Sequence, residues 1–235
     1  MLLKNPDGSE TFYEAAGDQN QPPLLLLHGI GADHAMWRPQ LERYPTKGYR
    51  LLVPDLFGHG RSSPLLKADL ACWHQQINWL LEAENVQECT LLGVSMGGVI
   101  AQAYLVAHPE RIHSVVLSDT FAELRTPLEK LLGFSQGVGF RLFRLLGIKL
   151  LASGMRSTYK APFAQAAQAY FSQVSLEIDL EQMILARKAI NQIDVLAKLA
   201  AIEVPALVLV GSEFGQTFVE INRKLGAALP QARVV

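Results

Sequence analysis

The stretch Cys89-Thr90-Leu91-Leu92-Gly93-Val94-Ser95-Met96-Gly97-Gly98-Val99-Ile100 decides the fold of this chain. Its first part, Thr90–Val94, is a short apolar run that predicts a buried strand. Ser95 follows at once, and Met96–Ala107 then predicts a helix that ends before Pro109. A strand and a helix separated by one polar residue predict a sharp turn at Ser95.

Gly93, Ser95 and Gly97 form the pattern Gly-x-Ser-x-Gly at this turn. A serine there takes a strained backbone conformation, and side chains at the flanking glycine positions would collide with the strand or the helix. The hydroxyl then points out of the turn, at a helix N-terminus that favours developing negative charge. This context favours a catalytic serine. The alternative is a tight packing turn in which Ser95 only caps the helix.

Apolar runs of strand length recur along the chain and alternate with helical stretches, which predicts an α/β fold with a mostly parallel sheet flanked by helices. The other expected strands are Glu10–Ala15, Leu24–Leu27, Tyr49–Val53, Ser114–Leu117, Pro205–Gly211 and Ala232–Val235. The expected helices that cover the sheet are Trp37–Tyr44, Asp69–Glu84 and Phe218–Leu229.

Several polar stretches come directly after expected strands. They are His28–Gly31, the glycine-punctuated loop Pro54–Ser63, Ser95 and Asp119. Because the carboxyl ends of parallel strands meet at one edge of a sheet, we expect these groups to share one rim.

The segment 121–195 contains no clear strand and predicts a helical lid inserted into a core formed by 1–120 and 196–235. The alternative is that these helices pack on a sheet face as ordinary core. The expected helices are Phe140–Leu151, Ala161–Phe171, Leu180–Asn191 with Asp179 and Gln182 in capping-box spacing, and a connecting helix Asp194–Ala201 capped by Asp194.

Composition excludes several classes of protein. With 235 residues, 49% of them hydrophobic and 18% charged, the chain fits one globular α/β domain. A formal net charge of −1 gives no electrostatic case for nucleic acid or for an anionic membrane. Two cysteines, Cys72 and Cys89, provide no disulfide framework, which indicates a reducing compartment such as the cytoplasm. We expect neither a signal peptide nor a transmembrane helix.

The quoted motifs, in this order, resemble the α/β-hydrolase fold family, specifically its lid-bearing single-domain serine hydrolases. The matching stretches are Leu24–Gly31, Pro54–Ser63, Leu92–Gly98, His108–Asp119 and Val204–Gly211. Enol-lactonase-like and carboxylesterase-like members are the most similar in general pattern. The resemblance implies that Ser95 is the nucleophile and that the backbone N–H groups of Ile30 and Met96 form an oxyanion hole, with both side chains as candidate cavity lining. It also implies structural roles for His28 and His59.

The acid of the catalytic triad departs from the family pattern. The resemblance places this carboxylate after the strand that ends at Gly211, where Phe214 stands instead. Asp119, at the end of the preceding strand, and Glu213, one position early, are the two substitutes. We favour Asp119, because some lipases that this chain resembles take their acid from that strand end.

The base histidine departs from the pattern as well. The resemblance implies a loop after the final strand, and the sequence ends within that strand. The histidines present are His28, His34, His59, His74, His108 and His113, and none has the motif of a base. We therefore expect a C-terminally incomplete form of a longer hydrolase, with apolar surface exposed at its last strand.

The resulting hypothesis is a serine hydrolase that cleaves an ester, thioester or lactone of a small to medium apolar molecule through an acyl-enzyme. No metal or organic cofactor is implied, because no His, Cys or Asp cluster has ligand spacing. The expected partner is a small-molecule substrate, and the oligomeric state is left open. The alternative is a non-catalytic binding or signalling protein on the same scaffold, which Phe214 and the unidentified base favour.

Overall fold

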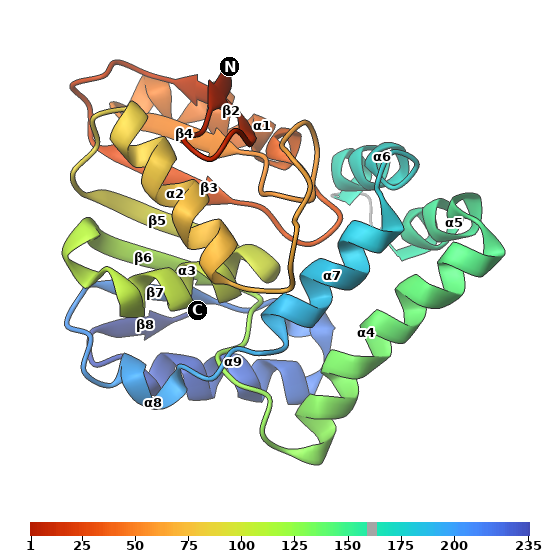
Figure 1. The fold of residues 1–235 in the computed structure, drawn as a ribbon. Helices are drawn as coiled ribbons and strands as arrows, with labels where there is room; N and C mark the ends of the chain where they lie inside the picture. The colour runs from red at the N-terminus through yellow and green to blue at the C-terminus, as the bar shows by residue number, and fades with distance from the viewer. Residues whose placement is uncertain (159–163) are drawn as a thin grey trace.

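An eight-stranded sheet forms the centre of the computed structural model, which describes residues 1–158 and 164–235 (Figure 1). The strand order is β1-β2-β4-β3-β5-β6-β7-β8. The strands β3 to β8 run parallel, and β1 and β2 join the β4 edge antiparallel. The strands are β1 Leu2–Lys4, β2 Glu10–Ala16, β3 Pro23–Leu27, β4 Arg50–Pro54, β5 Cys89–Val94, β6 Ile112–Ser118, β7 Ala206–Leu209 and β8 Ala232–Val234. The expected mostly parallel sheet is confirmed, and the short β1 was not predicted.

The apolar runs become central strands because both of their faces are covered. Leu25, Leu26 and Leu27 of β3 are fully buried between β4 and β5. A fully buried leucine contributes roughly 1.5–3 kcal/mol relative to an exposed one, so a run of three fixes β3 at the centre of the sheet. Gly93 of β5 pairs with Leu27 on one side and with Leu117 on the other, which places the turn at Ser95 in mid-sheet.

One face of the sheet is covered by α2 (Ala71–Ala83), α3 (Met96–Ala107), α8 (Leu196–Leu199) and α9 (Gln216–Ala228). On the opposite face Trp37 packs over β3 and β4, near α1 (Arg38–Arg43). Farther along that face the side chains of Val116, Leu207 and Leu209 are only half-buried. At the β8 edge Val234 and Val235 are exposed, as expected for this strand. Short 3-10 helices at His34–Trp37, Pro45–Lys47, Pro109–Arg111 and Ser212–Phe214 complete the connections.

The helices α4 to α7, which follow β6 in the sequence, are grouped to one side of the sheet (Figure 1). They are α4 (Pro127–Leu146), α5 (Ile148–Thr158), α6 (Gln165–Val174) and α7 (Leu180–Ile190). The single helix expected over 140–151 is wrong, because Gly147 has a φ of 95° and separates α4 from α5. Of the helix expected over 161–171, residues 161–163 lie outside the described residues.

The helix caps also differ from expectation. Asp179 caps α7 by accepting from the N–H groups of Glu181 and Gln182, but the expected capping box is wrong. The Gln182 side chain instead accepts a hydrogen bond from Leu65 N–H at 2.7 Å. The structure has a capping box at the start of α4, between Thr126 and Glu129. Asp194 does not cap α8, whose N-cap is Val195, because its carboxylate pairs with Arg125 at 2.7 Å.

Candidate functional site

The turn after β5 has the geometry of a strained strand-to-helix turn. Ser95 has φ 52° and ψ −113°, a conformation that non-glycine residues rarely take. A Cβ at Gly93 would collide with the Gly97 carbonyl, and one at Gly97 would collide with the Leu27 carbonyl. The strain is held by neighbours, since Ser95 N–H donates to the Ser118 carbonyl at 2.9 Å. The two glycines are therefore required by the close approach of β5, α3 and β3.

Ser95 lines a cavity of about 530 Å³ between the rim of the sheet and the helices α4, α6 and α7. Ile30 and Asp119 line the same cavity. The backbone at Gly29 passes close to the serine, because a Cβ placed there would lie 3.7 Å from Ser95 Cβ. Three of the predicted site residues thus lie around one space. The Met96 side chain does not, since it is fully buried in the hydrophobic core.

Asp119 follows β6 and has a φ of 49°, so it too occupies an unusual conformation. Its Oδ1 accepts from Gly211 N–H at 2.8 Å, and its Oδ2 accepts from the Ser118 hydroxyl at 2.8 Å. Its backbone N–H donates to the Leu209 carbonyl at 3.0 Å. These contacts fix the carboxylate at the junction of β6 and β7. Glu213, the alternative acid, is exposed in the 3-10 helix after β7 and does not line the cavity.

His28 and His59 are buried under the rim loops. Leu56 N–H donates to His28 Nε2 at 3.0 Å, so His28 Nδ1 donates to the Gly29 carbonyl at 2.8 Å. His59 Nδ1 lies 3.4 Å from the Phe57 carbonyl. Burial lowers the pKa of His28, and it lowers the pKa of His59 to about 3. Both imidazoles are therefore neutral, and His28 connects the loop after β3 to the loop after β4 through Leu56 N–H.

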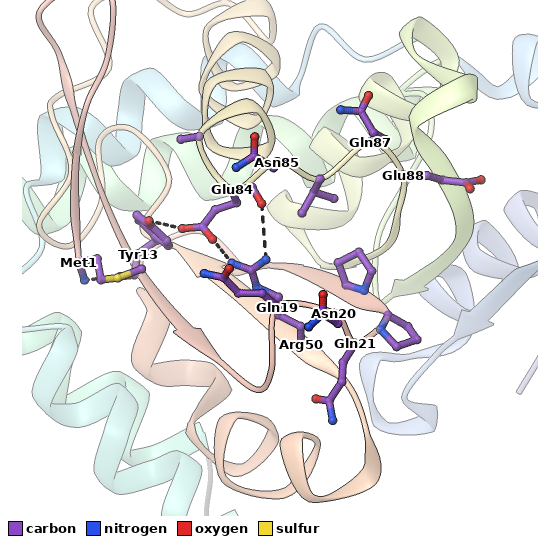
Figure 2. A pocket seen from close by; sticks show the side chains of 14 residues that line it. Met1, Tyr13, Gln19, Asn20, Gln21, Arg50, Glu84, Asn85, Gln87 and Glu88 are labelled. Carbon is purple, nitrogen blue, oxygen red and sulfur yellow. Dashed lines mark hydrogen bonds and ion pairs between the residues drawn. The ribbon is translucent and has the colours of Figure 1, made fainter.

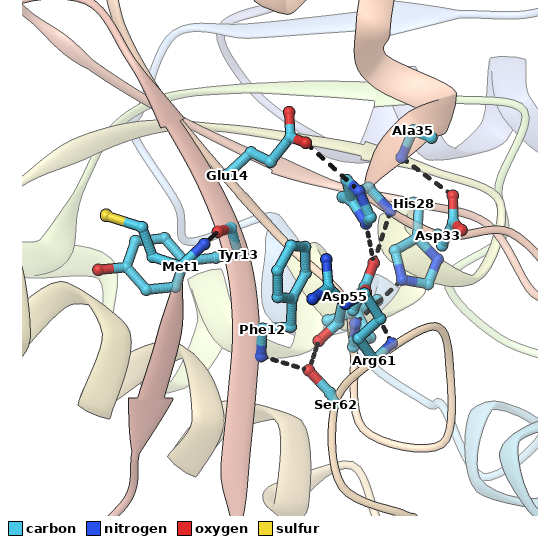
Figure 3. Close-up of polar contacts among 12 residues, drawn as sticks. Met1, Phe12, Tyr13, Glu14, His28, Asp33, Ala35, Asp55, Arg61 and Ser62 are labelled. Carbon is cyan, nitrogen blue, oxygen red and sulfur yellow. Dashed lines mark hydrogen bonds and ion pairs between the residues drawn. The ribbon is translucent and has the colours of Figure 1, made fainter.

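Asp55 is the centre of a polar cluster (Figure 3). His34 belongs to this cluster, because its Nδ1 lies 2.7 Å from Asp55 Oδ1. Asp55 is fully buried and accepts from His34 N–H and His34 Nδ1, both at 2.7 Å, and from Arg61 N–H at 2.8 Å. Glu14 lies 3.5 Å from the other imidazole nitrogen. Burial opposes charge on His34, but the hydrogen bond to Asp55 and the nearby carboxylates raise its pKa. The cluster ties the loop after β3 to the loop after β4.

The remaining histidines lie away from the rim. His74 of α2 and His108 at the end of α3 pack against Tyr104, with ring centroids 5.7 Å and 4.8 Å from it. Burial lowers the pKa of His74 to about 4. His113 is exposed near the start of β6, at the opposite end of that strand from Asp119. Within the described part of the chain no histidine lines the Ser95 cavity, and no group of three His, Cys, Asp or Glu side chains is placed to hold a metal ion.

Sequence reasoning missed two charged residues of the cavity wall, Arg187 of α7 and Glu129 of α4. Arg187 is buried, and burial lowers its pKa to about 10. Glu129 accepts from the N–H groups of Thr126 and Arg125, both at 2.8 Å. Helical spacing could have indicated Arg187, because it follows Met183 by four positions and precedes Ile190 by three, and both of these are buried.

A second cavity, of about 830 Å³, lies away from Ser95 and is lined largely by polar side chains (Figure 2). Arg50, the first residue of β4, forms an ion pair there with Glu84, and Tyr13 donates its hydroxyl to the same carboxylate. All three side chains are largely buried. Arg50 is therefore neutralised within the chain.

The chain belongs to the alpha/beta hydrolase fold family, whose model matches residues 22–235. Among curated relatives, 3-oxoadipate enol-lactonase 1 of Acinetobacter baylyi is 24% identical, covering 95% of this chain and 86% of the relative. Lipase 3 of Moraxella sp. is 28% identical, covering 97% of this chain and 74% of the lipase. The solved enol-lactonase of Burkholderia xenovorans superposes with a TM-score of 0.85 at 25% identity, covering 100% of this chain and 90% of that one.

These matches confirm the predicted fold and the resemblance to esterase-like and enol-lactonase-like hydrolases. They identify the protein as a hydrolase by family. In residues 1–158 and 164–235 no helix has the length and hydropathy that a membrane span requires.

Proposed function

We propose that the protein is a serine hydrolase that cleaves an ester, thioester or lactone of a small to medium apolar molecule through an acyl-enzyme. The observation that carries the proposal is the strained conformation of Ser95, at the N-terminus of α3 and on the wall of a cavity. A packing turn has no reason to expose a strained serine to a cavity. The enol-lactonase and lipase among the relatives support a carbonyl substrate.

The N–H groups of Ile30 and Met96 form the oxyanion hole in this proposal. Met96 is the first residue of α3, where the N–H has no carbonyl partner within the helix and the helix dipole favours an anion. Among the described residues, no acceptor takes a hydrogen bond from Ile30 N–H. Asp119 is the proposed acid, because it lies on the cavity wall and Glu213 does not.

The helices α4 to α7 act as a lid over the site, so that 121–195 is an insertion in a core formed by 1–120 and 196–235. The lid contributes Phe171, Arg187 and part of α4 to the cavity wall. Cys72 and Cys89 are both free thiols, which supports the cytoplasm as the place of action.

The first test is Ser95→Ala in a p-nitrophenyl butyrate assay, made in any form of the protein that turns over this ester. We expect kcat to fall on the order of 10⁴-fold, with the melting temperature nearly unchanged, because the hydroxyl faces the cavity. Turnover retained in Ser95→Ala would exclude the serine mechanism. For the acid, in a form of the protein that has its base histidine, Asp119→Asn should cost more activity than Glu213→Gln, since without the orienting carboxylate that histidine takes the wrong tautomer. The reverse order would assign the acid to Glu213.

The proposal also holds that none of the six histidines is the base, since none lines the cavity. Hydrolysis by residues 1–235 should then be slow, and added imidazole should increase the part of the rate that depends on Ser95. The matched control is Ser95→Ala at the same imidazole concentration, which removes hydrolysis by imidazole itself. Efficient turnover that is lost on changing one of the six histidines would identify a relocated base.

The absence of a histidine from the wall of the Ser95 cavity, among the described residues, favours the second candidate, a binding protein on a hydrolase scaffold. That candidate predicts no turnover dependent on Ser95 at any imidazole concentration.

A further inference from the structure

The cavity beside Ser95 is mostly apolar and has three ionisable side chains on its wall, Asp119, Glu129 and Arg187. The two carboxylates are satisfied within the chain, Asp119 by Gly211 N–H and the Ser118 hydroxyl, and Glu129 by two backbone N–H groups. Arg187 differs from the two carboxylates, because its hydrogen bonds within the described residues leave part of its guanidinium unused.

Arg187 has no carboxylate partner. Its Nε donates to the Gly133 carbonyl at 2.9 Å, and its Nη1 donates to Gln136 Oε1 at 2.8 Å, so both partners are neutral. Its guanidinium carbon lies 5.3 Å from the centre of the Phe121 ring. In the part of the chain that the structure describes, no carboxylate oxygen lies within 4.0 Å of Arg187, and Nη2 donates to no acceptor. Residues 155–163 contain neither Asp nor Glu.

This arrangement is energetically unusual. Arg187 is 8% exposed, and an arginine so deeply buried is nearly always paired, because removing a charge from water costs several kcal/mol. Although burial lowers the pKa of Arg187 to about 10, the side chain is cationic at neutral pH. An unpaired cation beside a reactive serine is best explained by a counter-ion that arrives with the ligand.

The geometry favours one class of anion. A guanidinium offers a planar fork of N–H donors that matches a carboxylate, and here Nε and Nη1 are occupied while Nη2 remains. Among the described residues Arg187 is the only cation on this cavity wall, which also carries the carboxylates of Asp119 and Glu129. A carboxylate carries the single negative charge that one guanidinium balances. The apolar part of the wall includes Ile30, Phe121, Leu124 and Ile221.

We propose that Arg187 anchors a carboxylate on the substrate, so that the preferred substrate is an ester, thioester or lactone carrying a free carboxylate beyond an apolar spacer. The scissile carbonyl lies at Ser95, the spacer lies along the apolar wall, and the carboxylate binds the guanidinium. This inference rests on the proposed serine hydrolase. The competing explanation is that Arg187 only ties α7 to α4 through Gly133 and Gln136.

The test is isothermal titration of Ser95→Ala protein, which does not consume the ligand, with monomethyl adipate and with dimethyl adipate. The two ligands differ by one charge and one methyl group. We expect the monoester to bind about 10- to 100-fold more tightly, as for a hydrogen bond to a charged group in a buried site. Equal affinities would overturn the inference, and this comparison needs no change at Arg187.

Variants then assign the effect. Arg187→Met, added to the Ser95→Ala protein, should reduce the preference for the monoester to within about twofold, and Arg187→Lys should retain part of that preference. The matched control is Arg144→Met, which removes the ion pair of α4 with Glu181 of α7 but lies off the cavity wall. This control should leave the preference intact. A preference that survives Arg187→Met, or one that Arg144→Met also abolishes, would overturn the inference.

The outcome is independent of the serine mechanism. If the anion preference is found and no hydrolysis depends on Ser95, only the proposed function fails. If hydrolysis depends on Ser95 and no preference is found, only the role of Arg187 fails.

Discussion

Two buried arginines lie in two different cavities of this molecule, and their surroundings differ in one respect. Arg50 has a side chain that is 6% exposed and pairs with Glu84, which Tyr13 also contacts (Figure 2). Arg187 is buried to a similar degree, but among the described residues its hydrogen-bond partners are the neutral Gly133 carbonyl and Gln136 side-chain oxygen. The first guanidinium is satisfied by the fold, and the second is left with capacity to bind.

This difference distinguishes a charge that stabilises the fold, on Arg50, from a charge that is available to a ligand, on Arg187. A buried ion pair adds little net stability, but removing one partner leaves an uncompensated charge and is costly. A buried charge with no partner in the chain is held there at a cost to stability, which selection tolerates where a ligand uses the charge. Neutralising Arg50 should therefore destabilise the protein much more than neutralising Arg187.

The largest effect is expected at the satisfied pair. Glu84→Gln should lower the free energy of unfolding by about 3–5 kcal/mol, because it leaves Arg50 buried and unpaired. The measurement is urea denaturation followed by circular dichroism. The matched control is Glu88→Gln in the same cavity, whose side chain is 53% exposed and which should change stability by about 0.5 kcal/mol or less. Equal effects of the two changes would mean that Arg50 does not depend on its partner.

A smaller loss is expected from Tyr13→Phe, which removes one donor to Glu84 and keeps the ion pair with Arg50. We expect about 1–2 kcal/mol, as for a hydrogen bond to a charged group. Urea midpoints of the single variants and of Tyr13→Phe/Glu84→Gln give the coupling between the two residues. Strict additivity would show that the tyrosine contributes independently of the carboxylate.

Neutralising Arg187 should cost less still. Arg187→Met should change the free energy of unfolding by less than about 1 kcal/mol, because the relief of an unpaired buried charge offsets two lost hydrogen bonds. The Gly133 carbonyl keeps a second donor, Asn191 Nδ2 at 3.2 Å. Arg50→Met, which strands Glu84, is the matched comparison and should cost at least about 2 kcal/mol more. If both changes destabilise equally, Arg187 is a structural residue and the contrast fails.

The smallest effect concerns a charge whose pairing depends on pH. Burial opposes ionisation of His34, but its hydrogen bond to Asp55 and the surrounding carboxylates raise the pKa. A raised pKa means that the stabilisation is fully present below the unfolded value, near 6.5, and is lost as the pH rises through the folded value. His34→Gln should therefore destabilise more at pH 5.5 than at pH 9, by about 1 kcal/mol or less. A penalty that grows with pH would contradict this pairing.

The sheet could be predicted from the sequence because most of its strands are continuous apolar runs. The helix after Ser95 begins and ends where its composition indicated, at Met96 and Ala107. The boundaries of the helices between β6 and β7 were harder to predict, because they depend on Gly147 and on capping side chains that have competing partners. Gln182, for example, bonds to Leu65, a contact between residues 117 positions apart that no local pattern contains.

Much of the candidate site could be predicted as well, since Ser95, Ile30 and Asp119 lie on one cavity wall. Arg187 could not be predicted from the residue type, because an arginine on a helix is usually a solvated charge. Its inward direction is set by packing of α7 on α4. The polar cavity around Arg50 could not be predicted, because Arg50 and Glu84 are distant in the sequence and are brought together by the packing of α2 on the sheet.

The most direct test uses two fluorophosphonates that differ only at the far end of the alkyl chain, where one has a carboxylate and the other its methyl ester. The measurement is the rate of covalent modification of Ser95, followed by intact-protein and peptide mass spectrometry. We predict modification of Ser95 by both probes, at least about tenfold faster with the carboxylate, and equal rates in Arg187→Met. No modification of Ser95 by either probe would contradict the serine nucleophile, and equal rates in the wild-type protein would contradict the role of Arg187.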